Sequence, residues 1–119
     1  MIDMAIVDFL LEVCFLPISC IFGLILNLII ILTIRKNRKK NLKDRFYEFM
    51  SLNAKFNCLY CIIYLLNLIS YCLYFDSIFC SAIYTTYFAQ FIKIFVIDYL
   101  GESVKICSNL SYLLMSLNR

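Results

Sequence analysis

Two long uncharged runs dominate the pattern of apolar and polar positions along this chain. Residues 13–34 carry no formal charge and lie between Glu12 and Arg35, and a second uncharged run covers residues 56–75. Because a helix rises about 1.5 Å per residue, the first run extends about 33 Å, slightly more than the roughly 30 Å hydrocarbon core of a bilayer. The pattern therefore predicts two membrane-spanning helices.

The last third of the chain allows two arrangements, because its two uncharged runs are short and four charged residues separate them. In one arrangement the chain crosses near 78–97, and a second, shorter segment follows. In the other, 76–94 is an extracellular or interfacial connection, and a single helix runs from about 95 to 119. We favour the second, because its length of about 37 Å is enough to cross a bilayer with some tilt.

Basic residues are concentrated in one connection. Residues 35–55 contain eight of the 11 Lys and Arg residues, whereas residues 1–12 contain acidic residues and no basic one. The positive-inside rule then predicts a cytoplasmic loop after the first helix and an extracellular N-terminus. The eight basic residues are Arg35, Lys36, Arg38, Lys39, Lys40, Lys43, Arg45 and Lys55.

The expected architecture is all-α, a helical integral membrane protein with three transmembrane helices and the N-terminus outside. We treat residues 1–119 as a single membrane domain. Its predicted segments are the extracellular N-terminus (1–12), helix 1 (13–34), the cytoplasmic basic loop (35–48), helix 2 (49–75), the extracellular or interfacial connection (76–94) and helix 3 (95–119).

Composition excludes a soluble enzyme. Hydrophobic residues make up 64% of the chain, charged residues 16%, and the mean hydropathy is +0.88, whereas soluble domains are about 45–50% apolar and about 25% charged. The chain has no histidine, the usual general base, so we assign no catalytic residue. Cys58 and Cys61 form a Cys-x-x-Cys pair inside an apolar run without a second pair, so we expect no metal and no cofactor.

Polar residues recur at helical spacing within the two runs. Ser19, Gly23 and Asn27 are four residues apart, and Asn53 and Asn57 repeat this spacing in the predicted helix 2. In lipid, polar side chains are stabilised by facing a neighbouring helix, and a glycine lets that helix approach closely. We therefore expect these residues to form helix contacts.

The predicted third helix carries charges on one face, at Asp98, Glu102 and Lys105. A charge at membrane depth costs about 2.5–3.5 kcal/mol on insertion scales, so such groups pair or face a polar cavity. We expect this face to turn toward the helix bundle. Two readings remain open, an intramembrane ion pair within the helix and a ligand-facing role.

Three segments resemble the first three helices of rhodopsin-like (class A) G-protein-coupled receptors. Residues 23–43 (GLILNLIIILTIRKNRKKNLK) are similar to that family's helix 1 and first intracellular loop, with Asn27 facing inward. Residues 50–54 (MSLNA) look like the start of its helix 2. Residues 108–119 (SNLSYLLMSLNR) are similar to a helix 3 that ends in the family's Asp/Glu-Arg-Tyr signature, here at Asn118 and Arg119.

The chain departs from the family pattern at identifiable positions. The family's helix 2 Asp, which belongs to its sodium site, has no counterpart, and Asn57 or Cys58 falls near that position. Asn118 stands in place of the acidic residue before the Arg. Cys80 lies too far from Arg119 to match the family's helix 3 Cys unless the first extracellular loop is enlarged.

The resemblance implies a divergent peptide receptor of the plasma membrane, of which this chain is an N-terminal fragment without autonomous signalling. Its implied partners are membrane lipid, the remaining receptor helices and, as part of a full receptor, a heterotrimeric G protein. The alternative is a small three-span subunit of a transporter, channel or assembly complex. The charge asymmetry around residues 13–34 argues against a meaningless translation of AT-rich DNA. No nucleic-acid partner is expected, because the basic run directly follows an apolar span.

Overall fold

The computed structural model of the protein describes residues 2–37, 45–67 and 85–118. Within these residues the chain is all-helical and contains no strand, as the sequence predicts. Several helical segments join end to end, some of them with wider π-helical turns. In chain order they are α1 (Ile2–Phe9), π-helical η1 (Leu10–Phe15), α2 (Leu16–Asn37), α3 (Arg45–Leu66), α4 (Tyr87–Phe91), π-helical η3 (Ile92–Gly101) and α5 (Glu102–Leu117).

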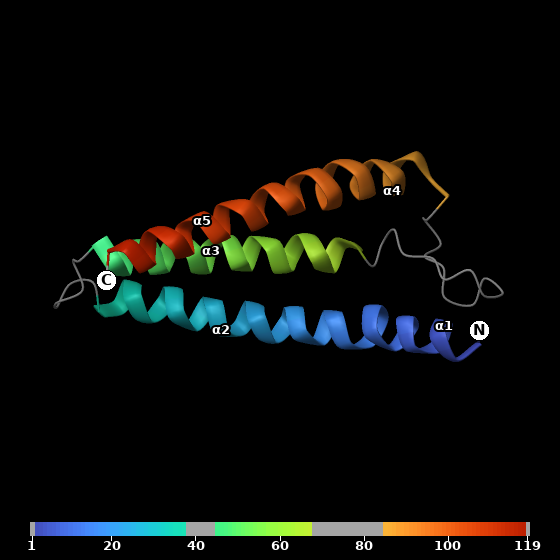
Figure 1. Ribbon diagram of the computed structural model, residues 1–119, viewed down its shortest axis with the longest axis horizontal. Helices are drawn as coiled ribbons and strands as arrows, with labels where there is room; N and C mark the ends of the chain where they lie inside the picture. The colour runs from blue at the N-terminus through green and yellow to red at the C-terminus, as the bar shows by residue number, and fades with distance from the viewer. Residues whose placement is uncertain (1, 38–44, 68–84, 119) are drawn as a thin grey trace.

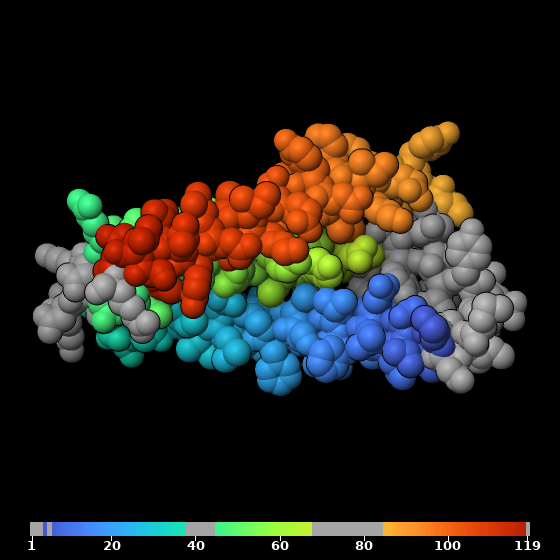
Figure 2. Space-filling view, viewed as in Figure 1, coloured from blue at the N-terminus to red at the C-terminus, as the bar shows by residue number. Residues whose placement is uncertain are grey.

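The segments form long rods that lie side by side with alternating directions (Figure 1). The rod of α3 is in the middle, because it packs against α2 on one side and against η3 and α5 on the other. Figure 2 shows α3 as a narrow strip between the other two rods. The end of α2, the start of α3 and the end of α5 share one end of the bundle, which we call the basic end because α2 finishes there with Arg35 and Lys36.

Two of the helices in the described part of the chain are long and apolar enough to cross a membrane. These are Ile6–Asn37, with 32 residues, and Arg45–Leu66, with 22 residues. Their apolar side chains are largely exposed, as at Phe22 (64% exposed) and Leu32 (61%). The third rod carries charged residues among its apolar ones and is not one of these two candidate membrane helices. The sequence therefore predicted the two apolar helices correctly, while the third crossing stays a prediction.

Small side chains make the contacts between the rods. Ala54 and Cys58 of α3 are buried, Cys20 is buried on α2, and Gly101 is buried on the third rod. A Cβ added at Gly101 would lie 3.4 Å from Cγ2 of Ile63 on α3, so the two backbones are close there. Small residues are typical of helix contacts in lipid, where close approach supplies dispersion and polar contacts.

The helices begin earlier than the boundaries drawn from the sequence. The third rod starts at Tyr87 rather than 95, because the Thr86 side chain caps it by accepting a hydrogen bond from the Ala89 backbone at 3.3 Å. The second helix starts at Arg45 rather than 49. The first helix is already helical at Ile2 and continues through Asn37. The sequence-predicted boundaries lie next to charged residues. Lys and Arg are good helix formers, however, and do not end a helix. The predicted end of helix 2 lies outside the described residues.

The π-helical segment η3 changes which residues of the third rod point inward. Ile92 and Gly101 are both buried, nine positions apart, with half-buried residues midway between them. A π-helix has more residues per turn than an α-helix, so its inward positions recur at wider spacing. Beyond Gly101 the α-helical spacing returns, and Val104, Ser108 and Ser111 continue the inward face.

Candidate functional site

A chain of polar groups connects all three rods. Ser108 on α5 donates from Oγ to Oδ1 of Asn57 on α3 at 2.6 Å. Asn57 donates from Nδ2 to Oδ1 of Asn27 on α2 at 3.5 Å, a long contact. Asn27 donates in turn to the backbone carbonyl of Gly23 at 2.7 Å. Asn57 and Asn27 each accept one hydrogen bond and donate another, an order in which neighbouring hydrogen bonds reinforce one another. We call Asn27, Asn53, Asn57 and Ser108 the polar contact.

Asn53 completes the polar contact on α3. Its Oδ1 lies 2.9 Å from the Ser108 hydroxyl, which also lies near Asn57 Oδ1. A serine hydroxyl has a single hydrogen, so the two amide oxygens share it. In the described part of the chain, every buried side-chain nitrogen and oxygen has a hydrogen-bond partner. The contact can therefore exist away from water without an uncompensated polar group.

Gly23 lies where α2 and α3 approach closely. A Cβ at this position would be 3.3 Å from Sγ of Cys61, which is tighter than an ordinary contact. Cys20, one turn before Gly23, is buried, and its thiol is hydrogen-bonded to Cys61. Ser19 departs from the expected helix contact, because its side chain is exposed. The face that meets α3 is centred on Cys20 rather than on its neighbour, so Ser19 falls outside it.

The Cys-x-x-Cys pair serves packing between helices. The Cys58 thiol points at the backbone carbonyl of Leu24 on α2 at 3.9 Å, and Cys61 contacts Cys20. Free Cys behaves as a small apolar side chain with a weak S–H donor, which suits a close contact between helices. Among the described residues, no group of three or more His, Cys, Asp or Glu side chains could hold a metal ion.

The charged face of the third rod, which we define as Asp98, Glu102 and Lys105, lies outside the bundle. All three residues are exposed. Nζ of Lys105 is 3.7 Å from Oε1 of Glu102, and these side chains are 52% and 65% exposed. The expectation that this face turns toward the helix bundle is corrected: the smaller residues Gly101, Val104 and Ser108 occupy the contact with α3, and the charges lie beside them.

Four further sequence-predicted residues lie at the basic end. Arg35 and Lys36 end α2, Arg45 starts α3, and all three are exposed. Asn118 follows α5, is exposed, and donates from Nδ2 to the Leu114 carbonyl at 2.8 Å. Five residues lie outside the described part of the chain: Arg38, Lys39, Lys40, Lys43 and Arg119.

Sequence reasoning missed the partner on the third rod. Ser108 is not among the residues that the sequence predicts at helix contacts, yet it joins both Asn53 and Asn57. A signal was present, because Gly101, Val104, Ser108 and Ser111 recur at spacings of three and four. This is a stripe of small residues of the kind that permits close helix approach.

No protein-family model, curated protein or solved structure matches the chain.

Proposed function

We propose that the chain is a multi-pass membrane protein of the plasma membrane, whose three rods form the N-terminal part of a rhodopsin-like receptor bundle. The N-terminus lies outside and the basic end is cytoplasmic. The ligand class that the resemblance implies is a peptide. Three helices lack the rest of the pocket and of the G-protein surface, so we expect no signalling from this part alone.

Exposed apolar side chains support membrane insertion. Phe22, Ile29 and Leu32 of α2 are each more than half exposed, on the outside of the bundle. Soluble monomers rarely leave continuous apolar surface of this kind in water, whereas a bilayer covers it without cost. The small residues between the rods support the same reading, because helices in lipid associate through close packing and polar contacts.

The contact between Asn27 and Asn57 is the single observation that carries the receptor reading. The resemblance expects an inward Asn on helix 1 and a polar partner on helix 2, and the partner bonded to Asn27 is Asn57 rather than Cys58. In this reading Asn57 occupies the place of the family's helix 2 Asp. Its amide is neutral, so hydrogen bonds hold the contact without a bound cation.

The unbroken third rod supports a crossing that ends at the basic end. Its backbone is helical from Tyr87 to Leu117 and passes through the charged face without a break. A crossing limited to 78–97 would need the chain to leave the membrane near Asp98. Glu102 and Lys105 would then stand in the outer half of the helix, where they are available to a ligand or to further helices.

Glycosylation mapping tests the topology. A strong glycosylation sequon placed at Ser81, and another appended after Arg119, would be expressed in microsomes. We expect modification at Ser81 and none at the C-terminal sequon, because only the former faces the lumen. An unmodified Ser81, together with protease access to residues 98–105 from the cytoplasmic side, would overturn the third crossing and the receptor reading with it.

The transcript downstream of the Arg119 codon tests the receptor reading directly. Long-read sequencing that finds four further hydrophobic spans in the same reading frame would support it. A stop codon immediately after Arg119 in full-length transcripts would overturn it. That outcome would favour the second candidate function, which shares the same topology.

The second candidate is a three-span subunit of a transporter, channel or assembly complex. The exposed charged face favours it, because Glu102 and Lys105 pair on an outer surface that a partner subunit could cover. Co-purification from native membranes with cross-linkers at residues 98 and 105 would test it. A defined partner that is lost when Glu102 and Lys105 exchange places would support a subunit role.

A further inference from the structure

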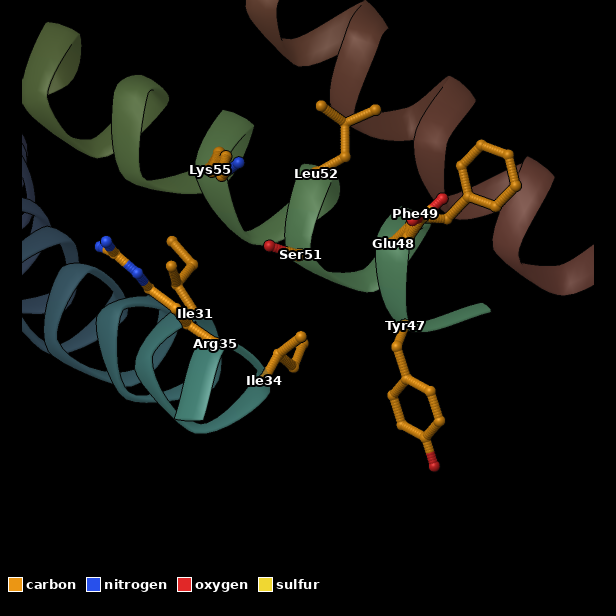
Figure 3. A pocket seen from close by; sticks show the side chains of 9 residues that line it. All are labelled: Ile31, Ile34, Arg35, Tyr47, Glu48, Phe49, Ser51, Leu52 and Lys55. Carbon is orange, nitrogen blue, oxygen red and sulfur yellow. The ribbon is translucent and has the colours of Figure 1, made fainter. Parts of the chain in front are cut away.

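A cavity lies between α2 and α3 at the basic end. Its volume is about 570 Å³, and Figure 3 shows side chains from the last turns of α2 and the first turns of α3 around it. Ile31, Ile34 and Arg35 come from α2, while Ser51 and Lys55 come from α3. No residue of the polar contact lines the cavity, although Asn53 lies between Leu52 and Lys55 on α3, so we treat the cavity as a site of its own.

The lining of the cavity combines two chemistries. Ile31, Ile34 and Leu52 provide apolar surface, whereas Arg35 and Lys55 provide positive charge and Ser51 a hydroxyl group. The guanidinium of an Arg presents several N–H donors that match phosphate oxygens, and a Lys ammonium adds a mobile point charge. Charge and apolar surface in one cavity suit an amphipathic anion rather than a simple ion.

Lys55 lies at the edge of the apolar part of α3, directly before the uncharged run that begins at residue 56. It is ten residues inside α3, about 15 Å from Arg45 along the helix axis, and only two residues before Asn57. A charged side chain next to the apolar part of a membrane helix is stabilised when it reaches water or a partner of opposite charge. An anion in the cavity would supply that partner without requiring α3 to move.

Arg35 and Lys55 are available to a ligand. Both are exposed, and neither forms an ion pair with another residue in the described part of the chain. Glu48 also lines the cavity, so two cations oppose one carboxylate and the net charge of the lining is positive. An anion is therefore favoured, and it is best placed on the Lys55 side, away from Glu48.

We propose that this cavity binds the headgroup phosphate of an anionic phospholipid, held between Arg35 and Lys55, with its acyl chains on the apolar part of the lining. The proposal requires insertion of α2 and α3 in a membrane, but it does not require the chain to belong to a receptor. In the topology given above the basic end faces the cytoplasm, where the leaflet is rich in anionic lipid. Ser51 can donate a further hydrogen bond to a phosphate oxygen.

The apolar part of the lining distinguishes lipid from free phosphate. Ile31, Ile34 and Leu52 add nothing to the binding of a hydrated inorganic ion, because such an ion gains no energy from apolar surface. They do favour the glycerol and upper acyl region of a lipid. A lipid should therefore resist displacement by inorganic phosphate.

Lipid binding by the purified full chain in detergent micelles tests the proposal. Fluorescently labelled phosphatidylserine and labelled phosphatidylcholine would be titrated, and binding followed by fluorescence anisotropy. The variant pair Arg35→Gln/Lys55→Gln removes both cations of the cavity. We expect it to weaken phosphatidylserine binding about tenfold or more, because each basic residue near an anionic headgroup contributes to the attraction.

A matched pair, Lys36→Gln/Lys93→Gln, removes the same charge outside the cavity, since neither residue lines it. We expect this pair to change phosphatidylserine binding by less than about twofold, the size of a diffuse charge effect. Equal losses in both pairs would overturn the site. An unaltered chain without preference for phosphatidylserine over phosphatidylcholine would overturn it as well, and that measurement needs no variant.

Two further measurements distinguish a lipid site from a free-phosphate site and test membrane insertion. Displacement of bound phosphatidylserine by millimolar inorganic phosphate would overturn the lipid assignment and leave a phosphate site. Release of the chain from membranes by alkaline extraction would overturn membrane insertion, and the lipid site with it. The receptor reading is tested by topology and transcript, so its failure would leave a positive lipid-binding result intact.

Discussion

Two sets of polar residues in this protein lie in different environments: one set lies between the rods, and the other is exposed. Asn27, Asn57 and Ser108 meet between the rods and bond to one another. The charged face, only two turns away along the third rod, is exposed, and its Glu102–Lys105 pair is held at 3.7 Å within a single helix. Asn53 and Asn57 of the polar contact are four residues apart on α3, as Asp98 and Glu102 are on the third rod, so spacing alone does not distinguish the two sets.

The difference lies in size and charge. Amides and hydroxyls can satisfy one another across a close helix contact, because each supplies both a donor and an acceptor or shares one hydrogen. A carboxylate and an ammonium are more costly to remove from water, even as a pair. Next to the charged face, Gly101 allows close approach to α3 and occupies the contact instead.

The close approach of α2 and α3 gives the largest expected effect. Gly23→Leu places a side chain where a Cβ alone would already be 3.3 Å from Cys61 Sγ. We expect a loss of about 1–3 kcal/mol in the free energy of unfolding, the usual cost of overpacking. Unfolding by SDS titration in mixed micelles, followed by circular dichroism, measures it. Thr33→Leu, which adds bulk on an exposed position of the same helix, should have little effect.

Loss of the polar contact is expected to have the second-largest effect on the free energy of unfolding. Asn57→Leu removes both the acceptor of the Ser108 hydrogen bond and the donor to Asn27. We expect a loss of about 1–2 kcal/mol, the range for polar contacts between membrane helices. Asn109→Leu makes the same chemical change on the exposed side of α5. Equal losses in both variants would show that leucine, rather than the lost contact, is responsible.

Ser108→Ala should cost less than Asn57→Leu. It leaves Asn27 and Asn57 bonded to each other and removes a single shared hydrogen. We expect a loss of about 0.5–1 kcal/mol, the net contribution of one hydrogen bond, in the same SDS titration. Ser116→Ala, on an exposed position of α5, is the control. A double-mutant cycle with Asn57→Leu should show coupling, and strict additivity would contradict a shared contact.

The sequence predicted the all-α fold and the two apolar helices because long uncharged runs leave few alternatives. It also singled out Asn27 and Asn57, because an amide side chain within such a run finds few hydrogen-bond partners except on a neighbouring helix. The start of the third rod at Tyr87 was not predictable from charge pattern. It depends on the cap made by Thr86, whereas the sequence reading used charges as boundaries.

The inward face of η3 could not be read from an α-helical period. Ile92 and Gly101 fall on one side because the π-helical turns of η3 widen the spacing. Ser19 shows the same limit on α2, where a shift of one position makes Cys20 the buried residue. Spacing identifies residues that share a face, while the packing of side-chain volume decides which face is inside.

The charged face gives the smallest expected effect on stability. Glu102→Gln/Lys105→Gln removes an exposed pair that lies within one helix, and such pairs contribute about 0–1 kcal/mol. We therefore expect the SDS titration of the purified chain to shift by less than about 0.5 kcal/mol. A loss above about 1 kcal/mol would mean that the face is covered in the micelle, as in a dimer, because desolvated charge pairs are costly to disrupt. Repeating the titration over a tenfold range of protein concentration separates these cases, since only an association responds to concentration. A small, concentration-independent shift keeps the face free for the ligand or partner helix proposed above.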